Sequence, residues 1–420
     1  MAELIRERPR RVAVLSKKPL STHRYDRWLS EFGVQTTLFA EDTPASRTFL
    51  AETHGYSAAP RLFPNWKLNR AVDQAVVDEH AEQPFDRIVA LSECDLVRAA
   101  ELRAHLDIPG QSLASAIAFR DKSLMKSLAG RAGLRVPDHA LVDSVSTLMD
   151  FADSHPDGVV VKPVDGSGSV GVVALRDRTA MESWVRARAL SGDEPTDYLV
   201  EEWVAAPMLS VDGLMRSGQV QAVMVGAYTR TCLHSLVDLA PHGILQLDAD
   251  DPRGAAARDY LARLLRALPA PEETMSFHCE LFDHPGYGPV LCEIACRTGG
   301  GNLDLIANAA LGIDLEQASC LGQAGIDVAV ERAVPESGRC YGDIVVPRSP
   351  QPVPRGLRCD LPGVLRFHNH PDDRPGRAAK VSDYVFDALL AHDDHAGVRG
   401  VYDSVIAWLD EHLAPAQGRC

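Results

Sequence analysis

Positive charge and long apolar runs are both scarce in this sequence. Its 43 lysines and arginines are outnumbered by 58 aspartates and glutamates, which gives a formal net charge of −15. A nucleic-acid-binding surface needs clustered basic side chains against the phosphates, so no nucleic-acid partner is expected. No segment approaches the roughly 18 consecutive apolar residues of a membrane-spanning helix, and the charged start MAELIRERPRR lacks the apolar core of a signal peptide. The sequence therefore predicts a cytoplasmic protein with no membrane partner.

The C-x-x-C motif that is common in metal and redox sites is also missing. The nine cysteines are scattered and none forms a C-x-x-C motif, which argues against a disulfide framework and a structural zinc site. Most lie in apolar segments and are expected to be reduced core thiols. Cys292 and Cys296 are close enough in sequence to share a metal ion, but alternation along their strand is expected to point both away from its charged face.

The G-x-G-x-x-G fingerprint of dinucleotide enzymes is absent from the first strand-to-helix turn, which reads SKKPLST. A nicotinamide or flavin site is therefore without support. The surrounding pattern is nevertheless α/β, because predicted strands alternate with predicted helices, which is typical of a parallel sheet. The strands are expected at 11–18, 34–42 and 85–93, and the helices at 21–33, 69–83 and 94–108. From the strand expected at 198–204 to about residue 300, strands and glycine turns are expected to dominate, and further helices are expected at 302–325 and 403–413.

A glycine-rich hairpin is predicted at residues 159–175, VVVKPVDGSGSVGVVAL. Glycines let successive backbone N–H groups point the same way and approach an anion closely, and Lys162 places an ammonium group at the base of the loop. The tip consists of Gly166, Ser167, Gly168 and Ser169. The loop suits a polyphosphate, although by itself it is equally compatible with a flexible hairpin beside a surface lysine.

Two glutamates are predicted to face each other on the hairpin SFHCELF-DHPGYGP-VLCEIACR. The midpoint between Glu280 and Glu293 falls inside the turn, and alternation puts His278 beside the first and Arg297 on the face of the second. Opposed like charges destabilise a sheet, and a Mg²⁺ ion held by both carboxylates would compensate. The alternative is a solvated acidic face balanced by Arg297.

Together these motifs resemble the ATP-grasp superfamily, and within it the carboxylate–amine ligases of the amino-acid (dipeptide) ligase type. The family's order of motifs is matched by RDKSLMKSLAGRAGLRVP, VKPVDGSGSVGV, VEEWV, HCELF and EIACRTGGG. The resemblance runs from the strand at Arg11 to at least Leu311. It implies an N-terminal Rossmann-like pre-ATP-grasp domain (1–117), a mobile α+β lid (118–204) and a larger mixed-sheet core with a C-terminal part (205–420).

The resemblance also implies roles for individual residues. ATP would be bound by Lys122, Lys162, Gly166, Ser167, Gly168, Ser169, Glu201, Glu202 and Val204. Glu280 and Glu293 would hold magnesium, and Arg297 and Lys162 would be catalytic. Substrate contacts would come from His278, Arg297, Gly300, Gly301 and Asn302, where RTGGGNLDLI opens a helix that can receive a carboxylate and Asn302 can serve as its N-cap.

Two positions depart from the family pattern. Met208 stands where an acidic residue usually contacts the ribose, a contact that Glu202 could supply instead. Ala295 stands where an asparagine often adds a metal ligand, which leaves Asn302 or a water as the substitute.

Outside these motifs, His368 and His370 alternate onto one face as metal ligands do, but an exposed pair near a proline turn is the favoured interpretation.

The reaction implied by the resemblance is ATP-dependent formation of an amide bond. A carboxylate would take the γ-phosphoryl group of ATP, and an amine would attack the acyl phosphate, releasing ADP and phosphate. The partners would be small carboxylates and amines, with a homodimer as an assembly that the family allows. Alternatives left open are an ATP-grasp carboxylase or nucleotide-biosynthesis ligase, and a regulatory ATP-binding module without turnover.

Overall fold

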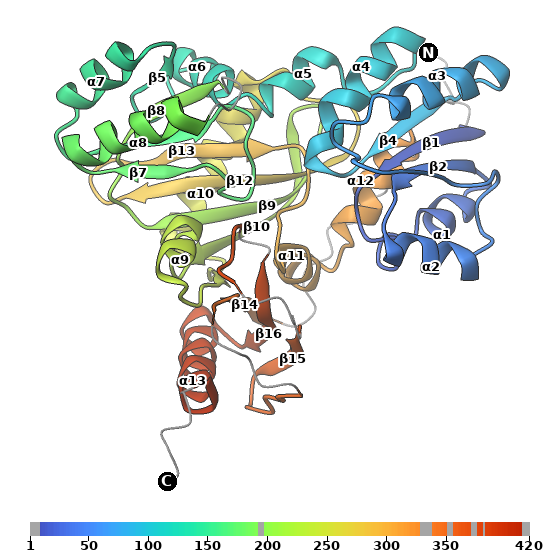
Figure 1. Ribbon diagram of the computed structural model, residues 1–420. Coiled ribbons are helices and arrows are strands. Elements are labelled where there is room, and N and C mark those ends of the chain that lie inside the picture. Colours follow the sequence, from blue (N-terminus) through green and yellow to red (C-terminus); the bar gives the residue numbers. More distant parts are fainter. Residues whose placement is uncertain are drawn as a thin grey trace, which may run out of the picture.

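The computed structural model describes residues 9–191, 197–327, 338–350, 356–370, 376–380 and 383–413. Three sheets organise these residues, two of four strands and one of eight (Figure 1). Among the described residues, no helix combines the length and the apolar character needed to cross a bilayer.

The N-terminal sheet is parallel, as the alternating pattern predicted, with strand order β3-β2-β1-β4. Apolar side chains fill both of its faces. Its strands are β1 (Arg11–Ser16), β2 (Gln35–Glu41), β3 (Arg61–Phe63) and β4 (Arg87–Ala90), and the helical segments around it are α1 (Tyr25–Ser30), α2 (Pro44–Glu52), α3 (Ala71–Glu82), η1 (Glu93–Asp95), α4 (Leu96–Leu106) and α5 (Leu113–Ala118). The sequence did not predict α2, in which Ser46 alone is buried.

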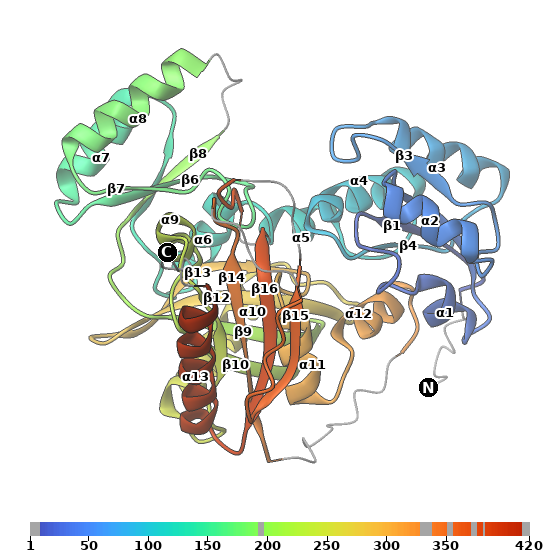
Figure 2. The same cartoon turned by 60° about the horizontal axis from the view of Figure 1, so that its bottom comes forward.

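The second sheet is antiparallel and contains the predicted glycine-rich hairpin, β6 paired with β7. Helices α7 and α8 lie on one side of it and project away from the rest of the molecule (Figure 2). The strands, in spatial order, are β5 (His139–Val142), β8 (Tyr198–Glu202), β6 (Val159–Pro163) and β7 (Val173–Leu175), and the helices are α6 (Lys122–Arg131), α7 (Val145–Ser154) and α8 (Arg178–Ser191).

The eight-stranded antiparallel sheet forms the centre of the molecule. In spatial order it contains β13 (Gly288–Ala295), β12 (Met275–His284), β9 (Met208–Arg216), β10 (Gln219–Tyr228), β11 (Ile244–Gln246), β14 (Cys340–Pro347), β16 (Tyr384–His392) and β15 (Val364–Asn369). Its helices are α9 (Cys232–Asp238), α10 (Pro252–Ala267), α11 (Leu303–Leu311), α12 (Leu315–Gln323) and α13 (His395–Leu413).

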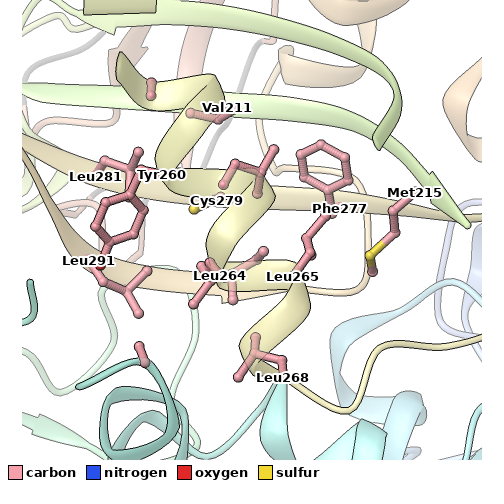
Figure 3. Close-up of a cluster of buried hydrophobic side chains, with 14 of the residues drawn as sticks. Val211, Met215, Tyr260, Leu264, Leu265, Leu268, Phe277, Cys279, Leu281 and Leu291 are labelled. Carbon is pink, nitrogen blue, oxygen red and sulfur yellow. The ribbon is translucent and has the colours of Figure 1, made fainter. Parts of the chain in front are cut away.

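Helix α10 covers one face of this sheet, and the sequence analysis missed it by expecting only strands and turns there. Tyr260 and Leu264 pack against Phe277, Cys279 and Leu281 of β12 (Figure 3). Alternation then directs the intervening residues of β12 to the opposite face. This packing places the polar residues of β12 on the side where the cavity described below lies.

Other boundaries also differ from the sequence prediction. The helix expected over 302–325 breaks at Gly312, which has a φ of +67°, and restarts after the Asp314 N-cap. Helix α13 begins at His395, eight residues before the segment predicted for the last helix. The domain limits at 117 and 204 stay predictions.

Candidate active site

A cavity of about 370 Å³ lies between the glycine-rich hairpin and the central sheet. It is lined by Lys122, Lys162, Gly166, Ser167, Gly168, Ser169, Glu201, Glu202, Val204, Glu280 and Glu293. The structure thus brings together every residue that the resemblance assigned to ATP and magnesium. His278, Arg297, Gly300, Gly301 and Asn302 are not among its lining residues.

The two glutamates of the β12–β13 hairpin pair directly with each other, as the symmetry of the turn predicted. A bulge follows at once, because Leu281 pairs with Leu291 and leaves Cys292 as an extra residue. Cys292 therefore lines the cavity beside Glu293, and the prediction that it points away from the charged face is wrong. Burial raises the pKa of its thiol to about 12, so it carries no thiolate at neutral pH.

Glu293 is balanced by a lysine from helix α6. The Nζ atom of Lys122 lies 3.2 Å from Glu293 Oε2 and donates a 2.6 Å hydrogen bond to the carbonyl oxygen of Gly166. Burial acts to raise the pKa of Glu293, but Lys122, Lys162 and Arg297 outweigh it and lower the pKa to about 2. The carboxylate is therefore ionised, and this position already attracts a cation.

Glu280 belongs to a second chain of hydrogen bonds. Tyr228 donates a 2.6 Å bond to Glu280 Oε1, and His278 Nε2 lies 3.7 Å from the same oxygen. His278 Nδ1 is 2.8 Å from Asp212 Oδ1, and Ser210 donates to the other oxygen of Asp212 at 2.5 Å. Burial acts to lower the pKa of His278, but Asp212 outweighs it and raises the pKa to about 10. The resemblance had pointed to His278 but not to Asp212 or Tyr228.

Lys162 lies in a buried cluster that the sequence analysis missed in part. Its Nζ atom is 2.8 Å from Glu201 Oε2, and Lys126 Nζ is 3.3 Å from Glu201 Oε1. Lys126 also donates to the carbonyl oxygens of Leu291 and Cys292, at 3.0 and 2.6 Å, which ties α6 to β13. Burial acts to raise the pKa of Glu201, but the two lysines outweigh this effect, and the pKa is lower than its ordinary value. The Glu201 carboxylate thus positions two lysines, and only its backbone is left for the expected adenine contact.

The hairpin tip adopts the left-handed backbone conformation at several neighbouring residues. The φ angles of Gly168, Ser169 and Gly171 are +64°, +59° and +75°. Such sequences of residues can turn successive N–H groups toward one point and form a concavity for an anion. Two hydrogen bonds hold the base of this loop. Lys122 Nζ donates to the carbonyl oxygen of Gly166, and the Gly166 N–H group donates to the carbonyl oxygen of Pro163.

An apolar end of the cavity lies beyond β8. Trp203, Val204 and Met208 line it together with Phe282 of β12 and Leu233 of α9. Such a slot suits a flat aromatic ring. Met208, which stands in place of the acidic residue of the family pattern, is 7% exposed and also lines the cavity. The Glu202 carboxylate accepts a 3.1 Å bond from the Asp138 N–H group at the edge of this slot.

Arg297 contacts the short helical segment η1, which follows strand β4 of the N-terminal sheet. Its Nε atom is hydrogen-bonded to Oε2 of Glu93, which follows β4, and Arg120 Nη1 lies 2.5 Å from the other oxygen of Glu93. Burial acts to raise the pKa of Glu93, but the two arginines outweigh it and lower the pKa to about 2. Glu93 therefore aims Arg297 from a distant part of the chain, a role that the sequence did not reveal.

The predicted N-cap at Asn302 is only partly correct. Helix α11 does begin at Leu303, but the Asn302 side chain makes no capping hydrogen bond. Asn302 is 3% exposed and its Nδ2 atom has no hydrogen-bond partner. The Ala295 side chain has no ligand atom, and Asn302 is not among the residues that line the cavity.

Replacing Glu93 with glutamine should remove an acid-sensitive part of the stability. A folded-state pKa of about 2, below the ordinary 4.5, contributes stability above pH 4.5 that is lost as the pH falls toward 2. We expect the difference in unfolding free energy between wild type and Glu93→Gln to shrink by up to about 3 kcal/mol over that range. Urea denaturation at several pH values measures it. Glu101→Gln, at a half-exposed side chain, is the control, and a pH-independent difference would contradict the Glu93 pairing.

Comparisons with known proteins support the ligase resemblance. No family model matches the chain. A curated relative, the L-arginine-specific L-amino acid ligase of Bacillus subtilis, is 23% identical over 242 residues. The matched stretch is 56% of this chain and spans 57% of that relative, little more than half its length.

Solved structures match over nearly the whole chain. The L-amino acid ligase of Bacillus licheniformis aligns with a TM-score of 0.69 and 19% identity, over 97% of this chain and 98% of its own. The carboxyaminoimidazole ribonucleotide synthase of Aspergillus clavatus, solved with ATP, aligns with a TM-score of 0.71 and 12% identity, over 96% of this chain and 99% of its own. At these identities the likeness shows the fold.

Proposed function

We propose that this chain, which has the ATP-grasp fold that its motifs predicted, is an ATP-dependent carboxylate–amine ligase. It would join an amino acid or small carboxylic acid to an amino acid or amine. The observation that carries the proposal is the facing pair of Glu280 and Glu293, placed beside Lys122 and Lys162 at the floor of a cavity roofed by a glycine-rich loop. The sequence match to an L-amino acid ligase supports the same class.

The cavity residues fit the parts of ATP in order. The apolar slot formed by Trp203, Val204 and Met208 would take the adenine ring, and the loop Gly166–Ser169 would cover the phosphates. Lys162 and Lys122 would neutralise the negative charge of the phosphates. Buried ion pairs with Glu201 and Glu293 hold these two lysines in place.

Magnesium fits the facing carboxylates, since this ion is typically held by one or two carboxylates and the substrate phosphates. Glu280 and Glu293 would hold it, and when bound it would neutralise charge on the phosphates. Lys122, now 3.2 Å from Glu293, would then be released toward the phosphate oxygens. With Ala295 in place of the usual asparagine, we propose that these two glutamates are the protein's magnesium ligands in the cavity.

The reaction needs positioning and charge stabilisation more than bond-making groups of the protein. A substrate carboxylate oxygen would form a bond to the γ-phosphorus while the bond to the β-phosphate oxygen breaks, giving ADP. An amine would then attack the acyl carbon and displace phosphate, losing its proton to solvent or a nearby base. Arg297, aimed by Glu93, would stabilise the developing negative charge on the transferred group and on the acyl oxygen.

The test is an ADP-release screen with ATP, Mg²⁺ and amino acids, singly and in pairs, followed by mass spectrometry of the products. The proposal expects ADP release that depends on two organic substrates and yields an amide. Release that depends on bicarbonate would favour a carboxylase instead. ATP binding without turnover under every condition would favour a regulatory module and overturn the ligase proposal.

The glycine-rich loop should become ordered when nucleotide binds. Its tip contains Gly166, Ser167, Gly168 and Ser169, whose small side chains offer little apolar surface for packing. We expect amide hydrogen exchange of this segment to slow in the presence of Mg²⁺ and a non-hydrolysable ATP analogue, because the phosphates accept bonds from its N–H groups. Buried helix α10 is the internal control. Equal exchange of the loop with and without nucleotide would contradict phosphate binding there.

A further inference from the structure

A group of two histidines and an aspartate lies on the outer part of the central sheet, at strands β15 and β16. His368 pairs directly across the strands with Asp387, and His370 follows two residues later on the same face. One ligand atom from each of the three residues can be chosen so that all lie within 4.8 Å of one another. None of the three lines the cavity assigned to ATP.

The geometry around Asp387 leaves one carboxylate oxygen facing both imidazoles. Arg366 Nη2 donates a 3.1 Å bond to Oδ1. Oδ2 is hydrogen-bonded to His370 Nε2 and lies 3.8 Å from His368 Nδ1. Arg366 therefore orients the carboxylate through one oxygen, as partners of metal ligands commonly do, while the other oxygen remains directed at the ring nitrogens.

Burial and exposure differ across the group in a way that suits an open metal site. The Asp387 side chain is 1% exposed, whereas those of His368 and His370 are 53% and 35% exposed. The anionic ligand is thus fixed at the base, and the two imidazoles stand at the surface where an ion and a water ligand have access. The centroids of the two imidazole rings are 4.0 Å apart.

A second acidic residue is buried beneath the histidines. Asp343 of β14 is buried on the same face, since its neighbour two residues along, Val345, pairs with Asp387. Arg366 is the cation that contacts Asp387 among the described residues around it. On the opposite face Phe367 packs against Trp408 of α13, which anchors the strand that carries both histidines.

We propose that His368, His370 and Asp387 form a binding site for a borderline divalent metal ion such as Zn²⁺. Two imidazole nitrogens and one carboxylate oxygen suit zinc and its transition-metal neighbours, whereas Mg²⁺ prefers oxygen ligands alone. Ligands of a tetrahedral zinc ion stand about 3.3 Å apart, so the three groups need only small side-chain rotations. A water would complete the coordination, and the ion would fasten edge strand β15 to β16. The sequence analysis favoured an exposed histidine pair without a metal. It did not identify Asp387, which the fold places beside the two histidines.

The experiment is a titration of the full-length, chelator-treated protein with Co²⁺ and Zn²⁺ in excess Mg²⁺, which keeps the Glu280–Glu293 pair occupied. Co²⁺ reports its ligands by visible absorption, and Zn²⁺ affinity follows from competition with a chromophoric chelator. We expect one site per chain, a visible band characteristic of four-coordinate Co²⁺, and a higher melting temperature with Zn²⁺.

His368→Gln and His370→Gln should each weaken Zn²⁺ binding at least ~100-fold, because losing a ligand costs more than the 10- to 100-fold typical of an outer-shell partner. His392→Gln is the matched control, since His392 is on the same strand as Asp387, is 49% exposed and lies 3.8 Å from Asp394. It should bind Zn²⁺ as the wild type does. Absent binding in the wild type, or equal binding in the His368 and His370 variants, would overturn the site. Neither result bears on ligase activity, so this inference and the proposed function can fail separately.

Discussion

Glu293→Gln is expected to lower Mg²⁺-dependent ADP release at least ~100-fold while the chain remains folded. Glutamine keeps the shape of the side chain but removes the negative charge that lies opposite Glu280. Under the proposed function this charge holds the magnesium ion that positions the phosphates. The structure also shows Lys122 at 3.2 Å from the carboxylate, so mutual repulsion of the two glutamates is already offset without metal. We therefore expect no gain in melting temperature from this substitution.

Asp283→Asn is the matched control for Glu293→Gln. Asp283 lies on the same hairpin and also loses one charge, but it does not line the cavity. ADP release by this variant should stay within about 2-fold of wild type, because a surface substitution away from the site changes little. Near-normal turnover of Glu293→Gln with an unchanged magnesium requirement would contradict the metal site and most of the argument for a ligase.

Arg297→Lys is expected to reduce kcat by roughly 10²- to 10³-fold, the usual scale for loss of one group that stabilises transition-state charge. Lysine keeps the positive charge but loses the planar fork that can donate two parallel hydrogen bonds. Since Glu93 and the Thr298 carbonyl oxygen hold the guanidinium in one orientation, a flexible ammonium group does not replace it. If the arginine acts only in the transition state, kcat and kcat/KM fall together.

Arg120→Lys separates this catalytic role from the pairing with Glu93. Arg120 contacts the other oxygen of Glu93, so its replacement disturbs the same carboxylate without removing Arg297. We expect a loss below about 10-fold for Arg120→Lys, measured as steady-state phosphate release with the substrates found in the screen. Equal losses in the two variants would mean that the ion pairs matter only for holding the N-terminal sheet on the core.

Local sequence patterns were sufficient to predict those features whose geometry depends on a short segment of the chain. The antiparallel pairing of Glu280 with Glu293 follows from the turn between them, and the glycine-rich hairpin follows from its flanking valines and its tip. The order of the motifs then predicted the fold. Each of the two hairpins lies within one short stretch of chain, so its pairing is set locally, whereas the order of the motifs extends from Arg120 to Gly301.

The bulge at Cys292 shows the limit of that reasoning. Strict alternation would turn its side chain to the core, but one extra residue in β13 shifts the phase and places it in the cavity. Helix α6 shows a second limit of reasoning from local patterns. Its buried face includes Lys122 and Lys126, because Glu201 and Glu293 arrive from other elements to pair with them.

The sequence by itself determined the alternation of the first sheet, the facing glutamates, the glycine-rich hairpin and the ATP-grasp order of motifs. Only the tertiary structure decided which charges are paired: Lys126 with Glu201, Arg297 with Glu93, and His370 with Asp387. The physical reason is that a buried charge is tolerated only beside a partner, and these partners come from separate strands and helices. Hydrophobic periodicity is a property of each segment alone, whereas an ion pair between segments exists only after they have packed.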